Sequence, residues 1–167
     1  MKKTKNITHA AIIGAMYFAL THLQNLLLPG STTWVIQCRA AEALCVLAFF
    51  TPAAIYGLGL GCLVFNLTFA GALPLDPILG TLATFLAAGA MYLLRNCKIR
   101  KLPLPGLLMP GIFNAFLVGW ELTVYIGGGF WLNALYVAIG EAAVLLSLGT
   151  ALFYALKTRG LDKRLFR

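Results

Sequence analysis

The sequence is poor in charge, and above all in acidic charge. Charged residues make up only 11% of the 167 residues, and five Asp and Glu stand against 13 Lys and Arg. Soluble domains contain about 25% charged residues, so this scarcity excludes an ordinary soluble domain. What is present instead is apolar, because 60% of the residues are hydrophobic and the mean hydropathy is +0.87. These values indicate a protein whose solvent is lipid.

Motifs of several catalytic and binding classes are also missing. The sequence has no P-loop GxxxxGK[ST], so the chain is not expected to hydrolyse ATP itself. Its four cysteines form no CxxC, and His9 and His22 share no ligand partner, which predicts neither a redox pair nor a metal site. No nucleophile with a base at workable spacing is found, so no enzyme is predicted. The run from Gly57 through Gly59 to Gly61 is GxGxG rather than GxGxxG, and it indicates close helix packing.

Apolar stretches punctuated by Pro, Gly and charge predict a single all-α domain, residues 1–167, folded as a six-helix membrane bundle. The predicted segments are residues 7–28, 39–50, 52–70, 76–94, 107–126 and 131–156. The first has a basic start but no convincing cleavage site, so we expect it to be retained. The second, about 12 residues long, is too short to cross a bilayer alone as a straight helix. It is expected either to extend towards Gln37 or to lie partly in the outer interface.

The cations lie between and beyond these segments. Twelve of the 13 fall in three groups, at residues 2–5, 95–101 and 157–167, which leaves Arg39 alone. Lys and Arg in short loops stay on the cytoplasmic side, so six crossings with both termini inside place all three groups there. The predicted outer connections contain no Lys or Arg. Because the cations form no stripe interleaved with aromatic residues, nucleic acid is not an expected partner.

The first segment has two distinct faces when it is drawn as a helix. Small residues form one stripe, which consists of Ala11, Ala15 and Ala19 and is extended by Gly14 and His22. Polar residues cluster roughly on the opposite side, namely Tyr17, Thr21, Gln24 and Asn25. A stripe of small residues lets another helix approach closely. That helix belongs either to this protein's own bundle or to a partner.

Charged groups inside apolar segments cost about 3 kcal/mol each near mid-membrane, so they normally have a partner or a function. Arg39 and Glu42 are three residues apart on one helical face and are able to pair. The other acids of this kind are Asp76, Glu121 and Glu141. Neither glutamate of the last two segments has a cation in its own helix. A ligand, Arg39 or a proton must therefore neutralise each of them.

Further polar and aromatic residues accompany these charges. Asn114, Glu121 and Tyr125 form one stripe, and Asn133, Tyr136 and Glu141 indicate a second polar face. The candidate ligand site comprises Gln37, Arg39, Glu42, Asn66, Asp76, Asn114, Glu121, Tyr125, Trp131, Asn133, Tyr136 and Glu141, with Trp34 and Trp120 in addition. Other interpretations stay open. Asp76 before Pro77 can be a helix N-cap, Trp34 and Trp131 can belong to an interfacial aromatic belt, and Arg39 with Glu42 can be purely structural.

Several stretches resemble the QueT family over nearly the whole chain. They are QCRAAEAL from Gln37, FTPA from Phe50, GCLVFN from Gly61, DPILGTLAT from Asp76, FNA from Phe113 and FWLNALYVAIGE from Phe130. The resemblance implies a six-helix S component, the substrate-binding subunit of an energy-coupling factor importer, in the bacterial cytoplasmic membrane. Such a component docks on a transmembrane T subunit driven by two cytoplasmic ATPases. ATP is then used by those partners, and no cofactor is expected in this chain.

The resemblance also implies roles for particular residues. The stripe of Ala11, Ala15 and Ala19 is similar to the AxxxA motif with which S components contact the T subunit. The implied ligands are queuosine precursors, 7-deazaguanine bases such as queuine, whose ring N–H and exocyclic amine form a donor pair for Glu121 or Glu141. The loop at residues 29–36 is expected to cover the ligand. Another flat nutrient, a stand-alone proton-coupled carrier and a membrane scaffold are the alternatives.

Overall fold

The computed structural model describes residues 2–32 and 36–166, and this part of the chain is helical throughout, without strands. The elements are α1 (Lys2–Leu27), η1 (Ala40–Phe49), α2 (Ala53–Thr68), α3 (Asp76–Leu93), η2 (Leu94–Asn96), α4 (Leu104–Leu107), α5 (Met109–Tyr125), α6 (Phe130–Val144), η3 (Leu145–Gly149), α7 (Thr150–Thr158) and α8 (Leu161–Phe166). Each of the six predicted segments corresponds to helix. The all-α prediction is therefore confirmed for the described residues.

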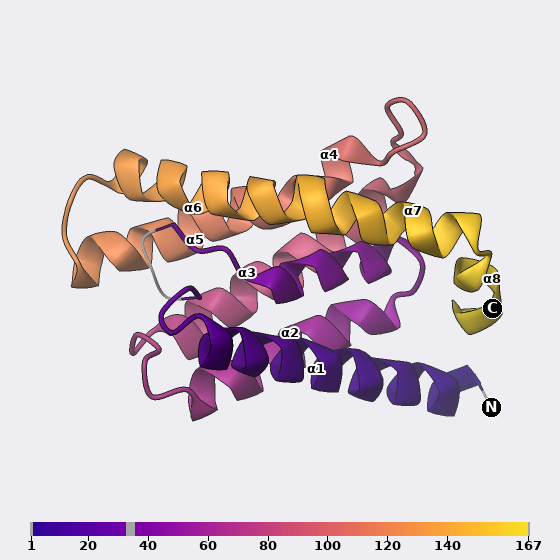
Figure 1. The fold of residues 1–167 in the computed structure, drawn as a ribbon, viewed down its shortest axis with the longest axis horizontal. Coiled ribbons are helices and arrows are strands. Elements are labelled where there is room, and N and C mark those ends of the chain that lie inside the picture. The colour runs from indigo at the N-terminus through magenta and orange to yellow at the C-terminus, as the bar shows by residue number, and fades with distance from the viewer. Residues whose placement is uncertain (1, 33–35, 167) are drawn as a thin grey trace.

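Four of these helical stretches are long and apolar enough to cross a membrane: Lys3–Leu27, Asp76–Asn96, Leu104–Tyr125 and Phe130–Thr158. Two shorter apolar helices, Ala40–Phe49 and Ala53–Thr68, complete the set. In Figure 1 the N-terminus, the C-terminus and the connection around α4 lie at one end of the bundle. The connections between α2 and α3 and between α5 and α6 lie at the other end. The three cationic groups of the sequence thus gather at one end, whereas six crossings with inward termini stay predictions.

The short second segment forms η1, a 3₁₀ helix at the centre of the bundle. Its residues from Ala41 to Phe49 are all buried, and it packs against α1, α2, α3, α6, η3 and α7. A 3₁₀ helix rises about 2.0 Å per residue, so ten residues reach roughly 20 Å where an α-helix would reach roughly 15 Å. Because protein rather than lipid surrounds η1, this element does not need the length of a membrane-spanning helix.

The remaining helices surround η1 in chain order, with α1 against α2, α2 against α3, α3 against α5 and α5 against α6. The first pair is closest, because a Cβ added to Gly57 would lie 2.6 Å from the Ala10 carbonyl oxygen. One added to Gly61 would lie 2.6 Å from the Gly14 carbonyl oxygen. The packing role predicted for the GxGxG run is confirmed.

This contact corrects the predicted faces of α1. Gly14 faces α2 and does not extend the alanine stripe, because its own added Cβ would meet the Gly57 carbonyl oxygen at 2.9 Å. His22 is half-buried against the rings of Phe18 and Phe65. Ala11, Ala15 and Ala19 themselves are exposed. The alanine stripe is therefore exposed, and Ala11 also lines a groove with Ala53 and Tyr56 of α2.

Between α1 and α7, the first and last long helices of the ring, the arrangement differs from that of the other neighbouring helices. Here α1 and α7 flank an apolar groove of about 320 Å³, and Leu44 and Leu47 of η1 contribute to its lining. The short helix α8 covers one end of the groove, where the Phe166 ring lies 5.6 Å from the ring of His9. Side chains of α8 thus bridge a position where the neighbouring long helices leave space.

A buried polar cluster as candidate functional site

A group of charged side chains lies buried where η1 begins, close to the start of α3 and to the C-terminal parts of α5 and α6. It contains Arg39, Glu42, Asp76, Glu121 and Glu141, none of which is more than 4% exposed. The chain has five acidic residues and 13 cations, so four of the five acids but only one cation lie here. The cluster therefore offers far more hydrogen-bond acceptors than donors.

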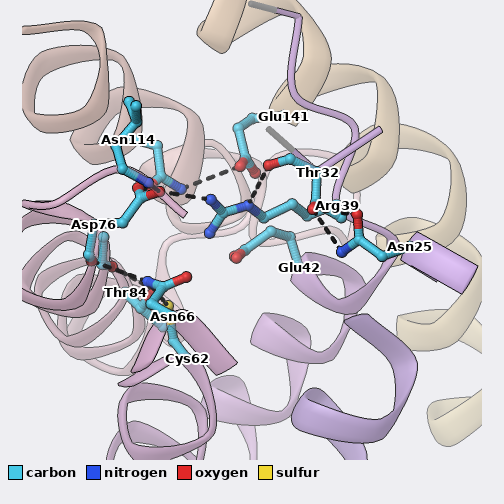
Figure 2. Close-up of polar contacts among 12 residues, drawn as sticks. Asn25, Thr32, Arg39, Glu42, Cys62, Asn66, Asp76, Thr84, Asn114 and Glu141 are labelled. Atoms are coloured by element: carbon cyan, nitrogen blue, oxygen red, sulfur yellow. Dashed lines mark hydrogen bonds and ion pairs between the residues drawn. The ribbon is translucent and has the colours of Figure 1, made fainter. Parts of the chain in front are cut away.

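Arg39 occupies the centre of this cluster. Its Nε donates to the Thr32 carbonyl oxygen at 3.1 Å, and its Nη2 lies 4.0 Å from Asp76 Oδ1. Figure 2 shows the guanidinium group pointing into the space between Asp76 and Glu141. The backbone of Arg39 is extended, with φ −81° and ψ 104°, because the residue precedes the first turn of η1. Its side chain consequently leaves the helix and reaches towards α3.

The predicted pairing of Arg39 with Glu42 is wrong. Among the described residues, Arg39 forms its ion pair with Asp76, while Glu42 accepts hydrogen bonds from the Tyr17 hydroxyl at 2.5 Å and from Cys45 Sγ at 3.1 Å. Spacing along one helix suggested the pair, but Arg39 lies outside the helix. The contact of Arg39 with Asp76, at the start of α3, replaced the contact with Glu42 that was expected within one helix.

Asp76 is held by contacts with the preceding loop and with α2, and not by the N-cap bond that its sequence position allowed. Its Oδ2 accepts a hydrogen bond from the Leu73 N–H at 2.9 Å, and its carbonyl oxygen accepts one from Asn66 Nδ2 at 2.9 Å. The cap position of α3 is Leu75, and no side-chain cap bond is formed there. The N-cap interpretation is therefore wrong, and the second carboxylate oxygen of Asp76 is directed to Arg39.

The polar face of α1 supports the backbone around Arg39. Asn25 and Thr32 exchange hydrogen bonds of 2.7 and 2.9 Å, and Thr32 is the residue whose carbonyl oxygen Arg39 binds. Gln24 donates to the Cys38 carbonyl oxygen at 2.5 Å and accepts from the Ala40 N–H at 2.7 Å. The sequence identified this face but did not connect it to the site. The signal was the cluster of polar residues on α1.

Glu141 and Glu121 complete the cluster from α6 and α5. Glu141 Oε1 accepts a hydrogen bond from Asn114 Nδ2 at 3.2 Å, which links these two helices. Glu121 is 0% exposed and lies within electrostatic range of Asp76 and Arg39. The two glutamates thus approach the same guanidinium group from neighbouring helices.

Several buried polar atoms, most of them in this cluster, have no hydrogen-bond partner among the described residues. They are Arg39 Nη2, Asn66 Oδ1, Asp76 Oδ1, Thr81 Oγ1, both carboxylate oxygens of Glu121 and Glu141 Oε2. A buried polar group without a partner costs about 1–3 kcal/mol, and a charged one costs more. Such a concentration is typical of a site that completes its hydrogen bonds with a bound molecule. Five of the seven atoms are carboxylate or amide oxygens, which accept hydrogen bonds. One is a hydroxyl group that can also accept, and one is a donor. A molecule rich in hydrogen-bond donors therefore fits best.

Some predicted site residues lie outside this cluster. Tyr125 and Trp131 are 43% and 74% exposed, and Trp120 is 49% exposed. Trp131 is two residues from Asn133 and so points to the opposite side of α6. Tyr125 is the last residue of α5, where no neighbouring helix covers it. Trp34 lies outside the described residues, and so does part of the loop at residues 29–36, whose covering role stays a prediction.

Three further predicted site residues, Asn133, Tyr136 and Gln37, lie in other surroundings. Asn133 Nδ2 donates to Thr123 Oγ1 and to the Gly127 carbonyl oxygen, both at 3.0 Å, so it fixes the turn between α5 and α6. Tyr136 is half-buried. Gln37 is buried, and its backbone packs so closely on α6 that a Cβ at Gly140 would overlap it. Among the described residues no group of three or more His, Cys, Asp and Glu is arranged to hold a metal ion.

Comparison with known proteins gave one match. The family model described as QueT transporter matches residues 7–158, which is most of the chain. No curated protein and no solved structure matches the chain. The matched range contains every residue of the buried polar cluster and the alanine stripe of α1.

Proposed function

Because the chain belongs to the QueT transporter family, and is thus a transporter rather than an enzyme, we propose that it captures queuosine precursors. In this proposal it is the S component of an energy-coupling factor importer in the bacterial cytoplasmic membrane. The ligand is a 7-deazaguanine base bound in the buried polar cluster. The observation that carries the proposal is the set of buried carboxylate, amide and guanidinium atoms that have no hydrogen-bond partner in the described part of the chain.

The chemistry of such a base matches the excess of acceptors. Its ring N–H and exocyclic amine present two parallel donors, which the two carboxylate oxygens of Glu121 can accept together. The lactam oxygen requires a donor, and Arg39 Nη2 is a donor without a hydrogen-bond partner among the described residues. Queuine and the aminomethyl precursor also carry an amine cation, for which Glu141 or Asp76 supplies a carboxylate.

The two faces of α1 support the role of the partner subunits. Ala11, Ala15 and Ala19 are exposed, whereas Tyr17 on the other side of the helix donates to Glu42 beside the polar cluster. In the proposal, the T subunit packs on the alanine face and the two ATPases supply the energy. One helix then contacts both the docking partner and the ligand site, so ligand release can follow docking.

The site is tested by binding measurements on the purified protein with queuine, its two precursor bases, guanine and common vitamins. We expect selective binding of deazaguanine bases and at least about tenfold weaker binding in Glu121→Gln or Glu141→Gln, as for loss of a charge-assisted hydrogen bond. Asp162→Asn makes the same chemical change at the other end of the bundle and should bind like wild type. Unchanged affinity in both glutamine variants would show that the site is elsewhere, and a selective vitamin would replace the substrate class.

The docking face is tested by uptake in cells that contain the T subunit and the ATPases. Ala15→Trp should abolish uptake and co-purification with the T subunit while ligand binding by the free protein is kept. Ala151→Trp on α7 is the control, because Ala151 is also an exposed helical alanine. Uptake that continues without the ATPases would instead indicate a proton-coupled carrier.

A further inference from the structure

A polar cavity lies at the end of the bundle where η1 finishes, away from the buried polar cluster. Its volume is about 200 Å³, and it is lined by Phe49, Phe50, Arg95, Asn96, Lys98, Phe153 and Lys157. These residues come from the end of η1, the connection after α3 and the helix α7. Figure 1 shows that this end also carries both termini of the chain. We refer to it as the basic pocket.

Among the described residues, three cations and no acid line the basic pocket. Arg95 is held in place, because its Nη1 donates to the Tyr92 carbonyl oxygen at 2.7 Å and its guanidinium carbon lies 4.0 Å from the centre of the Tyr92 ring. Lys157 Nζ lies 3.0 Å from Asp162 Oδ2 and 5.3 Å from the Phe50 ring centre. One neighbouring carboxylate thus compensates only part of the positive charge, and Arg95 keeps further N–H groups for an anion.

Aromatic rings form the inner wall of the basic pocket. Phe153 lies 5.6 Å from Phe50 in a stacked arrangement and 5.9 Å from Phe49 in an edge arrangement, measured between ring centres. Phe49 and Phe153 are both buried. The pocket therefore places an apolar surface directly beside its cations. A purely hydrophilic anion would use only the charged half of this lining.

The pocket lies at the boundary between the lipid-facing side chains and the cationic end. Leu93, two residues before Arg95, is 76% exposed, and Tyr154, three residues before Lys157, is 42% exposed. Apolar side chains that are exposed on a membrane helix face hydrocarbon, and the cations that follow them lie at headgroup depth. Phospholipid phosphates occupy this depth in the bilayer.

We propose that the basic pocket binds the phosphate headgroup of an anionic phospholipid, with the three cations on the phosphate and the phenylalanine rings against the glycerol and first acyl carbons. Basic pockets between membrane helices at the cytoplasmic side bind such headgroups in general. The ligand comes from the bilayer rather than from solution, because only a lipid satisfies both the charged and the aromatic parts of the lining. This proposal is independent of the transported substrate.

The test compares the full chain in nanodiscs of phosphatidylcholine alone with nanodiscs that also contain phosphatidylglycerol. We expect phosphatidylglycerol to raise the Tm and to remain bound in native mass spectra. Lys98→Gln should weaken retention of phosphatidylglycerol about fivefold, as for the loss of one cation near an anionic lipid. Lys101→Gln is the matched control, because it removes the same charge from the same connection without lining the pocket. Lys98→Arg should restore retention.

Each contrary result overturns the proposal in a defined way. Equal Tm and equal retention in the two lipid mixtures would show that no anionic lipid is bound specifically. An equal loss of phosphatidylglycerol retention in Lys98→Gln and Lys101→Gln would show that the lipid responds to the overall positive charge of this end and not to the pocket. Stabilisation in phosphatidylcholine by inorganic phosphate, to the level reached with phosphatidylglycerol, would assign the pocket to soluble anions. A circular dichroism spectrum like that of wild type confirms that each variant is folded.

Discussion

The two ends of η1 lie in contrasting surroundings. At its start, Arg39 and Glu42 belong to a cluster in which several buried polar atoms have no partner among the described residues. At its end, the side chains from Leu44 to Phe49 join an apolar core with residues such as Leu58 and Met91, all below 9% exposed. Both regions are buried, but of the two only the first contains buried polar atoms without a hydrogen-bond partner among the described residues. Burial alone therefore does not indicate that every polar group has a partner.

Removal of the Arg39 guanidinium group should have the largest effect on the polar end of η1. Arg39→Ala leaves four buried acids without a guanidinium group, and loss of one partner from a buried ion pair costs about 3–5 kcal/mol. We expect a fall in the Tm together with loss of ligand binding. Thermal unfolding and calorimetry with queuine measure the two effects. A variant that keeps its affinity would show that Arg39 only neutralises its neighbours and does not contact the ligand.

A cavity in the apolar end should lower stability without affecting binding. Leu58→Ala removes a side chain that is 0% exposed, and such changes cost about 2–5 kcal/mol. Exposed Leu60→Ala on the same helix is the control and should cost much less. Unfolding midpoints and ligand affinity are measured for both. If Leu58→Ala weakened binding as strongly as Arg39→Ala, the two ends of η1 would not be independent.

The hydroxyl that joins α1 to the polar end should have an intermediate effect. Tyr17→Phe removes the donor to Glu42 Oε1 and leaves a buried acceptor unpaired, at a cost of about 1–3 kcal/mol. Tyr56→Phe, on an exposed tyrosine of α2, provides the control. Differential scanning fluorimetry of the two variants compares them directly. Equal midpoints would mean that the bond between Tyr17 and Glu42 contributes nothing net.

Trp131 should have the smallest effect, because it belongs to neither region. Its side chain is 74% exposed, and surface substitutions away from a site change stability by at most about 0.5 kcal/mol. Trp131→Ala should therefore bind ligand as the wild-type protein does. A tenfold loss of affinity would show that α6 presents this ring to the ligand and that the site extends beyond the buried cluster.

The helices and the membership of the polar cluster follow largely from sequence patterns. Apolar runs and their Pro and Gly boundaries predicted the six apolar helical stretches but not the short helices α4 and α8, and the cost of buried charge identified Arg39 and the four acids. Periodicity within one helix did not predict contacts between helices. It paired Arg39 with Glu42, although the extended backbone at Arg39 sends the side chain to Asp76 on α3.

Periodicity also does not show where a helix loses its neighbours. Tyr125 shares a stripe with Asn114 and Glu121, yet it is exposed because α5 ends there. The supporting role of Asn25 and Gln24 depends on how residues 31–40 fold back onto α1, and nothing in the local sequence determines that path. Properties of single helices were thus predictable, whereas their arrangement in space was not.

The helices around η1 form a ring that is less tightly packed at one position, between α1 and α7. Four extensive interfaces connect α1 through to α6, but between α1 and α7 there is an apolar groove bridged by the side chains of α8. Such a ring widens first between α1 and α7. Separating these two helices disrupts less packed surface than separating the helices of any of the four interfaces. Widening there swings α1 away from η1 and stretches the bond from Tyr17 to Glu42. Force applied to the exposed alanine face would then reach the buried acids through the Tyr17 hydroxyl group and through the bonds of Gln24 and Asn25 to the segment before η1.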